Sequence, residues 1–138
     1  MDKFIKLHNS DDNGLIVVNS EAIIAILAYH EKNNRMTSKV YLDNACSLAP
    51  FIVNETPAFI VPQDDKDFIT LHEIQANEVV IIRKSEISVI DTVPMSNGLG
   101  KSSKSKLYFF GNSEMKPTLV HESSEKIMNI LNGEVENK

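Results

Sequence analysis

The sequence predicts a mainly β (α+β) fold. It consists of two tandem, pseudo-symmetric antiparallel β units of about five short strands each, with a C-terminal helix that closes the second unit. One observation is that the segment Phe4–His8 returns 64 residues later as Phe68–His72. Another is that the segment Ser38–Leu42 returns 67 residues later as Ser105–Phe109. The third is that apolar and β-branched residues come in short runs separated by polar turn residues, which is typical of strands.

The expected strands of the first unit lie at residues 4–7, 15–18, 23–30, 39–43 and 50–54. Their counterparts in the second unit lie at residues 68–71, 79–82, 87–93, 106–110 and 117–121. Residues 9–14 are predicted to form a hairpin turn, in which Asn13 and Gly14 can take positive φ. A short turn or a single helical turn is expected at residues 19–21 and 83–86, between the second and third strands.

The third strand of the first unit is ambiguous when it is considered alone. The segment Ala22–Tyr29 has the propensity of a helix as well as of a strand, and its periodicity does not separate the two. Its counterpart Ile87–Val93 alternates and is rich in β-branched residues. Because the two segments occupy equivalent positions, both are predicted to be strands.

The second unit is expected to end in a short helix. Ser123 is a good N-cap residue, Glu125 lies in the first turn, and Gly133 lies just past the end. The predicted apolar face consists of Ile127, Ile130 and Leu131. In the first unit Pro57 is compatible with a first helical turn but Pro62 ends the segment, so one turn or none is expected there.

The predicted units span residues 1–61 and 67–138, with a polar linker at 62–66 and a frayed tail at 133–138. A unit of this size buries too little surface to be very stable alone. The two units are therefore expected to pack as one compact body.

Composition and charge restrict the classes of partner. The net charge of −5 is shared by both halves, which argues against a nucleic-acid backbone as the main partner. Cys46 is the only cysteine, so no internal disulfide can form and a reducing compartment is expected. The N-terminus has no apolar signal-like region, and the longest apolar stretch, Ala22–Tyr29, is too short to span a membrane. We expect a cytoplasmic protein that has no membrane partner.

Several short motifs carry a resemblance to a known family. They are Phe68–His72, Val79–Ile82, Ile87 with Ile90, and Leu119–Ile127, together with Val18-Asn19 and residues 53–56 of the first unit. They resemble the small FlbD/SwrD-like family, whose members combine an I-K-L-T strand, a V-N strand end, an I-E-x-I strand and a closing V-V-x-E-S-x-E-E-V step. The Asp-Gly hairpin that is usual between the last two strands is missing, and residues 44–49 and 111–116 replace it. The resemblance implies a non-enzymatic protein of a family that is linked to flagellar function and has uncharacterised relatives.

Three histidines are the candidate metal ligands. His8 and His72 stand at equivalent positions at the ends of the first strands, and His121 ends a strand before the helix. They could bind a metal ion if the units bring them together. The alternative is that each is a solvated strand-end residue, and no second cysteine or acidic cluster supports a metal. No metal and no cofactor are therefore predicted.

Glu55 and Glu122 recur at the step from the last strand to the helix, and Ser123 follows the second of them. A carboxylate at this place can accept hydrogen bonds from the free amides of a helix N-terminus, which the helix dipole favours. We expect all three residues to be structural. No two carboxylates are spaced in a way that indicates general acid and base catalysis.

The loop at residues 96–106 contains Gly100-Lys101-Ser102, which is similar to the end of a phosphate-binding loop. The motif requires a glycine where Met95 stands, and a helix rather than a strand after it. A hairpin tip is therefore the simpler interpretation. Lys101, Lys104 and Lys106 could still contact an acidic partner through their positive charge.

These features are compatible with three functions. The first is a non-enzymatic interaction or assembly module, of a bacterial accessory, phage or mobile-element type, that binds a protein partner or itself through open sheet edges. The second is a protein that binds a small ligand between the two units. The third is an enzyme, whose simplest form would be a site made of His121 and Glu122. A catalytic role for Cys46 would need a nearby base, which the sequence does not show.

Overall fold

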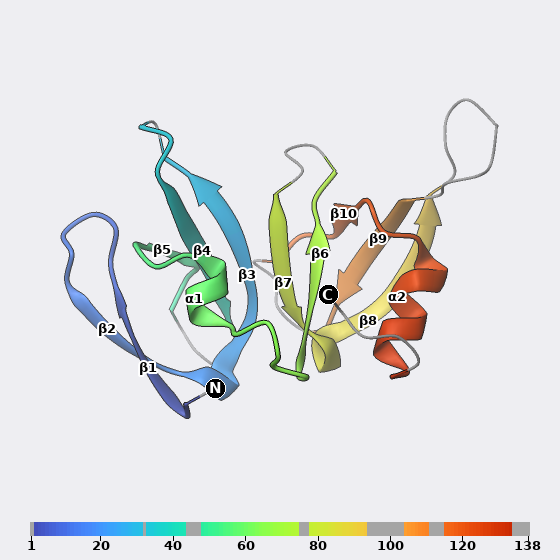
Figure 1. The fold of residues 1–138 in the computed structure, drawn as a ribbon, viewed down its shortest axis with the longest axis horizontal. Coiled ribbons are helices and arrows are strands. Elements are labelled where there is room, and N and C mark those ends of the chain that lie inside the picture. The colour runs from blue at the N-terminus through green and yellow to red at the C-terminus, as the bar shows by residue number, and fades with distance from the viewer. Residues whose placement is uncertain are drawn as a thin grey trace.

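We describe the protein from a computed structural model, which places residues 2–31, 33–43, 48–74, 78–93, 104–110 and 115–133. The first half contains β1 (Phe4–His8), β2 (Leu15–Asn19), the 3₁₀ turn η1 (Ser20–Ala22), β3 (Ile23–His30), β4 (Met36–Leu42), β5 (Phe51–Val53) and α1 (Pro57–Ile60). The second half contains β6 (Phe68–His72), β7 (Val79–Arg83), η2 (Lys84–Glu86), β8 (Ile87–Val93), β9 (Lys104–Phe109), β10 (Thr118–Val120) and α2 (Ser124–Leu131). The fold is mainly β, as predicted, and the same succession of elements occurs in each half (Figure 1).

The strands form three antiparallel sheets, β1–β2, β5–β4–β3–β7–β6 and β10–β9–β8. Narrow contacts join these sheets to one another. The amide of Asn54 donates to the carbonyl of His8 at 2.8 Å, which links β5 to β1, and the amide of His121 donates to that of His72 at 2.8 Å, which links β10 to β6. The strands therefore follow one another as a ribbon in the order β2–β1–β5–β4–β3–β7–β6–β10–β9–β8.

The two halves meet within the central sheet, where β3 of the first half pairs with β7 of the second. Ala25 lies opposite Ile82, and Leu27 lies opposite Val80. Arg83 strengthens this joint from the end of β7, because its guanidinium donates to the backbone carbonyls of Ile23 at 2.8 Å and Ser20 at 2.7 Å. The halves thus share one sheet, which the sequence alone does not establish.

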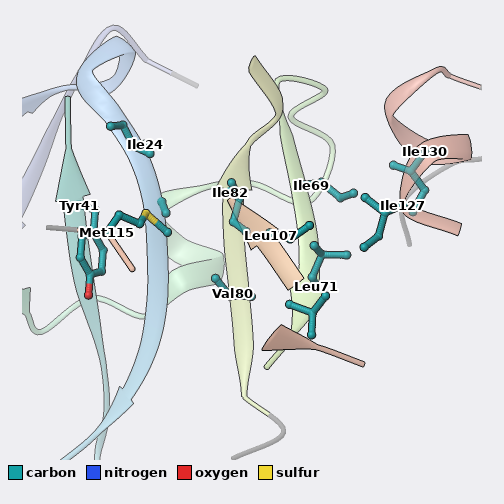
Figure 2. Packing of buried hydrophobic residues seen from close by; sticks show 12 residues of the cluster. Ile24, Tyr41, Ile69, Leu71, Val80, Ile82, Leu107, Met115, Ile127 and Ile130 are labelled. Atoms are coloured by element: carbon teal, nitrogen blue, oxygen red, sulfur yellow. The ribbon is translucent and has the colours of Figure 1, made fainter. Parts of the chain in front are cut away.

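Two hydrophobic cores cover opposite faces of this shared sheet. One core contains Ile24, Val80 and Ile82, which pack with residues of the second half such as Leu107 and Ile127 (Figure 2). The other core contains residues from the first half together with two from β6 and β7. Its buried members are Leu7, Val18, Ile23, Ile26, Val40, Leu42, Val53, Ile60, Val61, Phe68 and Ile81. Because β3 and β7 are covered on both faces, they read as nearly continuous apolar runs.

The predicted elements agree with the structure in most places. The segment Ala22–Tyr29, which was ambiguous alone, forms most of β3. Single 3₁₀ turns stand at the two predicted interruptions, and Asn13 takes a positive φ of 59° in the first hairpin. The first helix is one turn long, and the second begins after Ser123, whose hydroxyl accepts from the amide of Lys126.

The bounds differ most for the fourth strand of each half. The predicted starts at residues 39 and 106 are too late, since β4 begins at Met36 and β9 at Lys104. Met36 pairs with His30 and Lys104 pairs with Val93, so hydrogen bonding extends the strands toward their hairpin loops. The predicted tail lies outside the described residues after Gly133. Within the described part of the chain, no helix is long and apolar enough to cross a membrane.

Candidate functional site

A histidine and a glutamate form the same hydrogen-bonded pair in each half. The Nδ1 atom of His8 lies 2.7 Å from Oε2 of Glu55, and the backbone amide of His8 donates to Oε1 at 2.8 Å. The Nδ1 atom of His72 lies 2.8 Å from Oε2 of Glu122, and its amide donates to Oε1 at 3.0 Å. Each carboxylate therefore ties the end of a first strand to the junction between the last strand and the helix.

These contacts correct the expected role of the two glutamates. Their carboxylates bind the first strand, and the residue that caps α2 is Ser123. A serine in the fourth strand holds each junction from the other side, since the hydroxyl of Ser38 donates to the carbonyl of Glu55 at 2.7 Å and that of Ser105 to the carbonyl of Glu122 at 2.8 Å. The junction thus fastens three strands together.

The electrostatic environment keeps both carboxylates ionised. Burial by itself would raise the pKa of Glu122, but hydrogen bonds from the ring and amide of His72, its own amide and the charge of His72 hold this pKa below the usual value. The same causes act at Glu55, where burial also opposes the change and the contacts with His8 lower the pKa. An ionised carboxylate accepts both N–H groups of its histidine, which favours the tautomer with the proton on Nδ1.

The three candidate metal ligands do not form one site. His8 and His72 are each paired with their own glutamate, while Nδ1 of His121 lies 3.2 Å from Nζ of Lys104. An ammonium group next to a ring nitrogen opposes the binding of a cation there. Over the described ranges, no cluster of three or more histidine, cysteine, aspartate or glutamate side chains could hold a metal ion.

The predicted cationic contact surface is described only in part. Lys104 and Lys106 are two residues apart in β9 and therefore lie on the same face of the sheet. Lys104 contacts His121, while Nζ of Lys106 lies 5.4 Å from the centre of the Tyr108 ring. Lys101, the Gly100-Lys101-Ser102 segment and Cys46 lie outside the described residues.

An open groove of about 770 Å³ lies where the two halves meet. Its lining residues come from β3, β4, β9, the residue after β6, and β10 with the segment that leads into it. They are Leu27, Lys39, Tyr41, Glu73, Lys106, Met115, Lys116, Pro117, Thr118 and Leu119. Figure 2 shows Met115 beside Tyr41 at this place. Lys39 and Lys106 occupy equivalent positions in the two halves, and each lies 5.4 Å from the ring of a tyrosine on its own strand.

The ends of the ribbon form two open strand edges. β2 pairs with β1, β8 pairs with β9, and no further strand of the described segments pairs with either. Both edges carry exposed apolar side chains, because Leu15 and Val17 of β2 are 59% and 56% exposed and Val89 of β8 is 52% exposed. Soluble proteins usually protect such edges with charges, prolines or covering segments. These two edges are therefore candidates for binding another polypeptide.

The sequence contains a signal for the histidine–glutamate pairs in the recurrence of both residues. His8 and His72 were recognised as equivalent positions, and so were Glu55 and Glu122. Because both residues recur at equivalent positions, a contact between them in one half predicts the same contact in the other half. The open edges carried no comparable signal, since β2 is as apolar as the buried β7.

Comparisons with protein-family models, with curated proteins and with solved structures found no match for this chain. The resemblance to the FlbD/SwrD-like family stays a prediction from the sequence motifs.

Proposed function

We propose that this protein is a non-enzymatic interaction or assembly module that binds another polypeptide through the open edges of β2 and β8. The observation that carries this proposal is that β2 and β8 each have one edge with no partner strand among the described residues, while Val17 and Val89 on these strands are exposed. Strand edges of this kind bind a further strand by backbone hydrogen bonds, and their side chains add specificity. The histidine–glutamate pairs support the non-enzymatic part of this proposal, because the contacts between His72 and Glu122 hold strands of the fold together.

Capture experiments with charged edge variants test this function. The immobilised protein is incubated with lysate of the cells from which it comes, next to the variants Val17→Lys, Val89→Lys and, as a control, Met36→Lys. Met36 is 38% exposed and lies in β4, away from both edges. We expect the same specific partner on the original protein and on the control, and less of it on at least one edge variant, since a buried lysine opposes strand pairing. A partner that both edge variants retain in full would contradict the proposal.

A second candidate function is the binding of a small anionic ligand in the groove between the halves. The observation that favours it is that three lysines, Lys39, Lys106 and Lys116, line one groove together with several apolar residues. Pockets for small molecules typically combine apolar walls with a few polar groups that converge on the ligand.

Native mass spectrometry of the purified protein tests this second candidate. We expect a bound species of defined mass that disappears in the Lys39→Ala and Lys106→Ala variants and persists in a Lys66→Ala control. Lys66 is exposed and does not line the groove. If the measured mass always equals that of the chain alone, also after incubation with cell extract, this result would contradict ligand binding.

A further inference from the structure

The chain already contains one example of the contact that its two open edges could make. In the joint between β3 and β7, Ile26 lies opposite Ile81, and both are buried in the core of the first half. A shift of 64 residues places β3 on β8 and β7 on β2. The two ends of the ribbon are therefore the counterparts of the two strands that pair in its middle.

Equivalent apolar side chains are buried on the hairpin β6–β7 but exposed on the hairpin β1–β2. Ile81 is 4% exposed because it packs across the joint, whereas its counterpart Val17 is 56% exposed. Phe68 is 5% exposed in the same core, whereas its counterpart Phe4 is 57% exposed. The hairpin β1–β2 thus carries apolar side chains at the positions that are buried in β6–β7, and among the described residues Phe4 and Val17 remain more than half exposed.

The other end of the ribbon shows the complementary difference. Ala25 in β3 is fully buried, whereas its counterpart Val89 in β8 is 52% exposed. Val61, which follows α1, is 3% exposed in the core that receives Phe68, whereas its counterpart Met128 in α2 is 49% exposed. The second half therefore has an uncovered counterpart of the surface that the first half uses to receive β6–β7.

We propose that β8 of one copy pairs with β2 of a second copy of this chain, in the manner of the internal joint between β3 and β7. The register follows from the internal one: Val89 lies opposite Val18, Ile90 opposite Val17, and Asp91 opposite Ile16. This inference rests on the proposed function and names the partner as the chain itself.

Side-chain packing supports this partner over an unrelated strand. In the proposed joint Val17 and Phe4 of one copy cover Ile90 and Met128 of the next, as Ile81 and Phe68 cover the first half internally. Burial of such side chains contributes about 25 cal/mol for each Å² of apolar surface. The edge backbone groups that pair with no strand in the described part of the chain also gain partners at the same time.

Two substitutions make this joint weaker than the internal one. Asn19 stands where Arg83 donates to Ile23 and Ser20, and Asp91 stands where Leu27 packs internally. Both changes reduce the hydrogen bonds or apolar contacts that the joint can form. The assembly is therefore reversible and depends on protein concentration.

The joint is heterologous, because it brings together two different surfaces, and it can produce rings or open chains of copies. β2 and β8 lie near opposite ends of the long axis of the molecule, so they do not meet within one copy (Figure 1). Each copy can therefore bind one neighbour through β2 and another through β8.

Light scattering over about a hundredfold range of concentration tests the proposal. The original protein is expected to rise from the mass of one chain to the mass of several, and the Met36→Lys control to do the same. Val17→Lys and Val89→Lys each block one of the two surfaces in every copy, so each variant alone is expected to stay at the mass of one chain. Since Val17 and Val89 are exposed in a single copy, the thermal midpoints are expected to stay within a few degrees of the original.

A mixture of the two edge variants gives the sharper result. The intact β8 edge of the Val17→Lys copy can pair with the intact β2 edge of the Val89→Lys copy, so we expect dimers with one copy of each and nothing larger. Assembly of either variant alone, or an original protein with the mass of one chain at every concentration, would overturn self-association. A third outcome is that the original protein remains a single chain but captures a different protein, which the Val17→Lys or Val89→Lys variant no longer captures. This outcome overturns only the identity of the partner, and the proposed function stands.

Discussion

Replacement of Ile26 by alanine is expected to lower the free energy of unfolding by about 2–5 kcal/mol, the usual range for removing a fully buried isoleucine side chain. Ile26 is 0% exposed and lies opposite Ile81 in the joint between the halves. The cavity would open where β3 is covered on both faces, so the sheet has little freedom to close around it. Denaturant unfolding at low protein concentration measures the loss.

The chain supplies a matched control for this substitution. Ile90 is the counterpart of Ile26 in β8, where the strand forms an open edge and the side chain is only half-buried. Ile90→Ala is therefore expected to cost about 1 kcal/mol, because less apolar surface is lost from the core. Equal losses for the two variants would contradict the assignment of β3 to the centre of the sheet and of β8 to its edge.

Replacement of Glu122 by glutamine is expected to change the dependence of stability on pH. The folded-state pKa of Glu122 is lowered from the ordinary value of 4.5, so ionised Glu122 stabilises the fold above that value. This stabilisation is lost as pH falls from about 4.5 through the lowered folded-state pKa. The glutamine variant does not ionise, so its unfolding free energy is expected to fall less steeply over the same acidic range.

At neutral pH the same variant is expected to be less stable by about 1.5 kcal/mol, the lower end of the range for hydrogen bonds to charged groups. The modest value reflects the 44% exposure of the His72 side chain, since solvent screens the charge on that side. Glu21→Gln is a suitable control because Glu21 is exposed in η1. Identical acid profiles for the original protein and for Glu122→Gln would contradict the role of this carboxylate.

Much of the secondary structure could be predicted because local signals agreed with one another. The alternation of Ile87–Val93 resolved the ambiguity of Ala22–Tyr29, and the polar interruptions at residues 19–21 and 83–86 marked the two 3₁₀ turns. Ser123 and Gly133 bounded the last helix. The polar interruptions and the capping residues act within a few residues along the chain, where propensity and capping decide the local structure. The comparison of Ala22–Tyr29 with Ile87–Val93 relies instead on the repeat of the sequence.

The pairing of strands could not be predicted in the same way. β2 and β7 are equally apolar and short, so neither the run Leu15–Val18 nor the run Val79–Ile82 shows which of them lies beside β3. The register is set by packing across the joint, for example by Phe68 and Arg83, and this packing involves residues distant in sequence. The histidine–glutamate pairs depend on the same long-range arrangement, which brings His72 next to Glu122.

Hydrogen exchange followed by mass spectrometry tests the central claim most directly, which is that the ribbon has one closed joint inside the chain and two matching open ends. At low concentration, amides of β3 and β7 at the joint are expected to exchange slowly, and those on the open edges of β2 and β8 much faster. At high concentration the exchange of β2 and β8 is expected to slow while that of β3 and β7 stays the same. Exchange at β3 and β7 as fast as at β2 and β8, or edges whose exchange does not depend on concentration, would contradict the account.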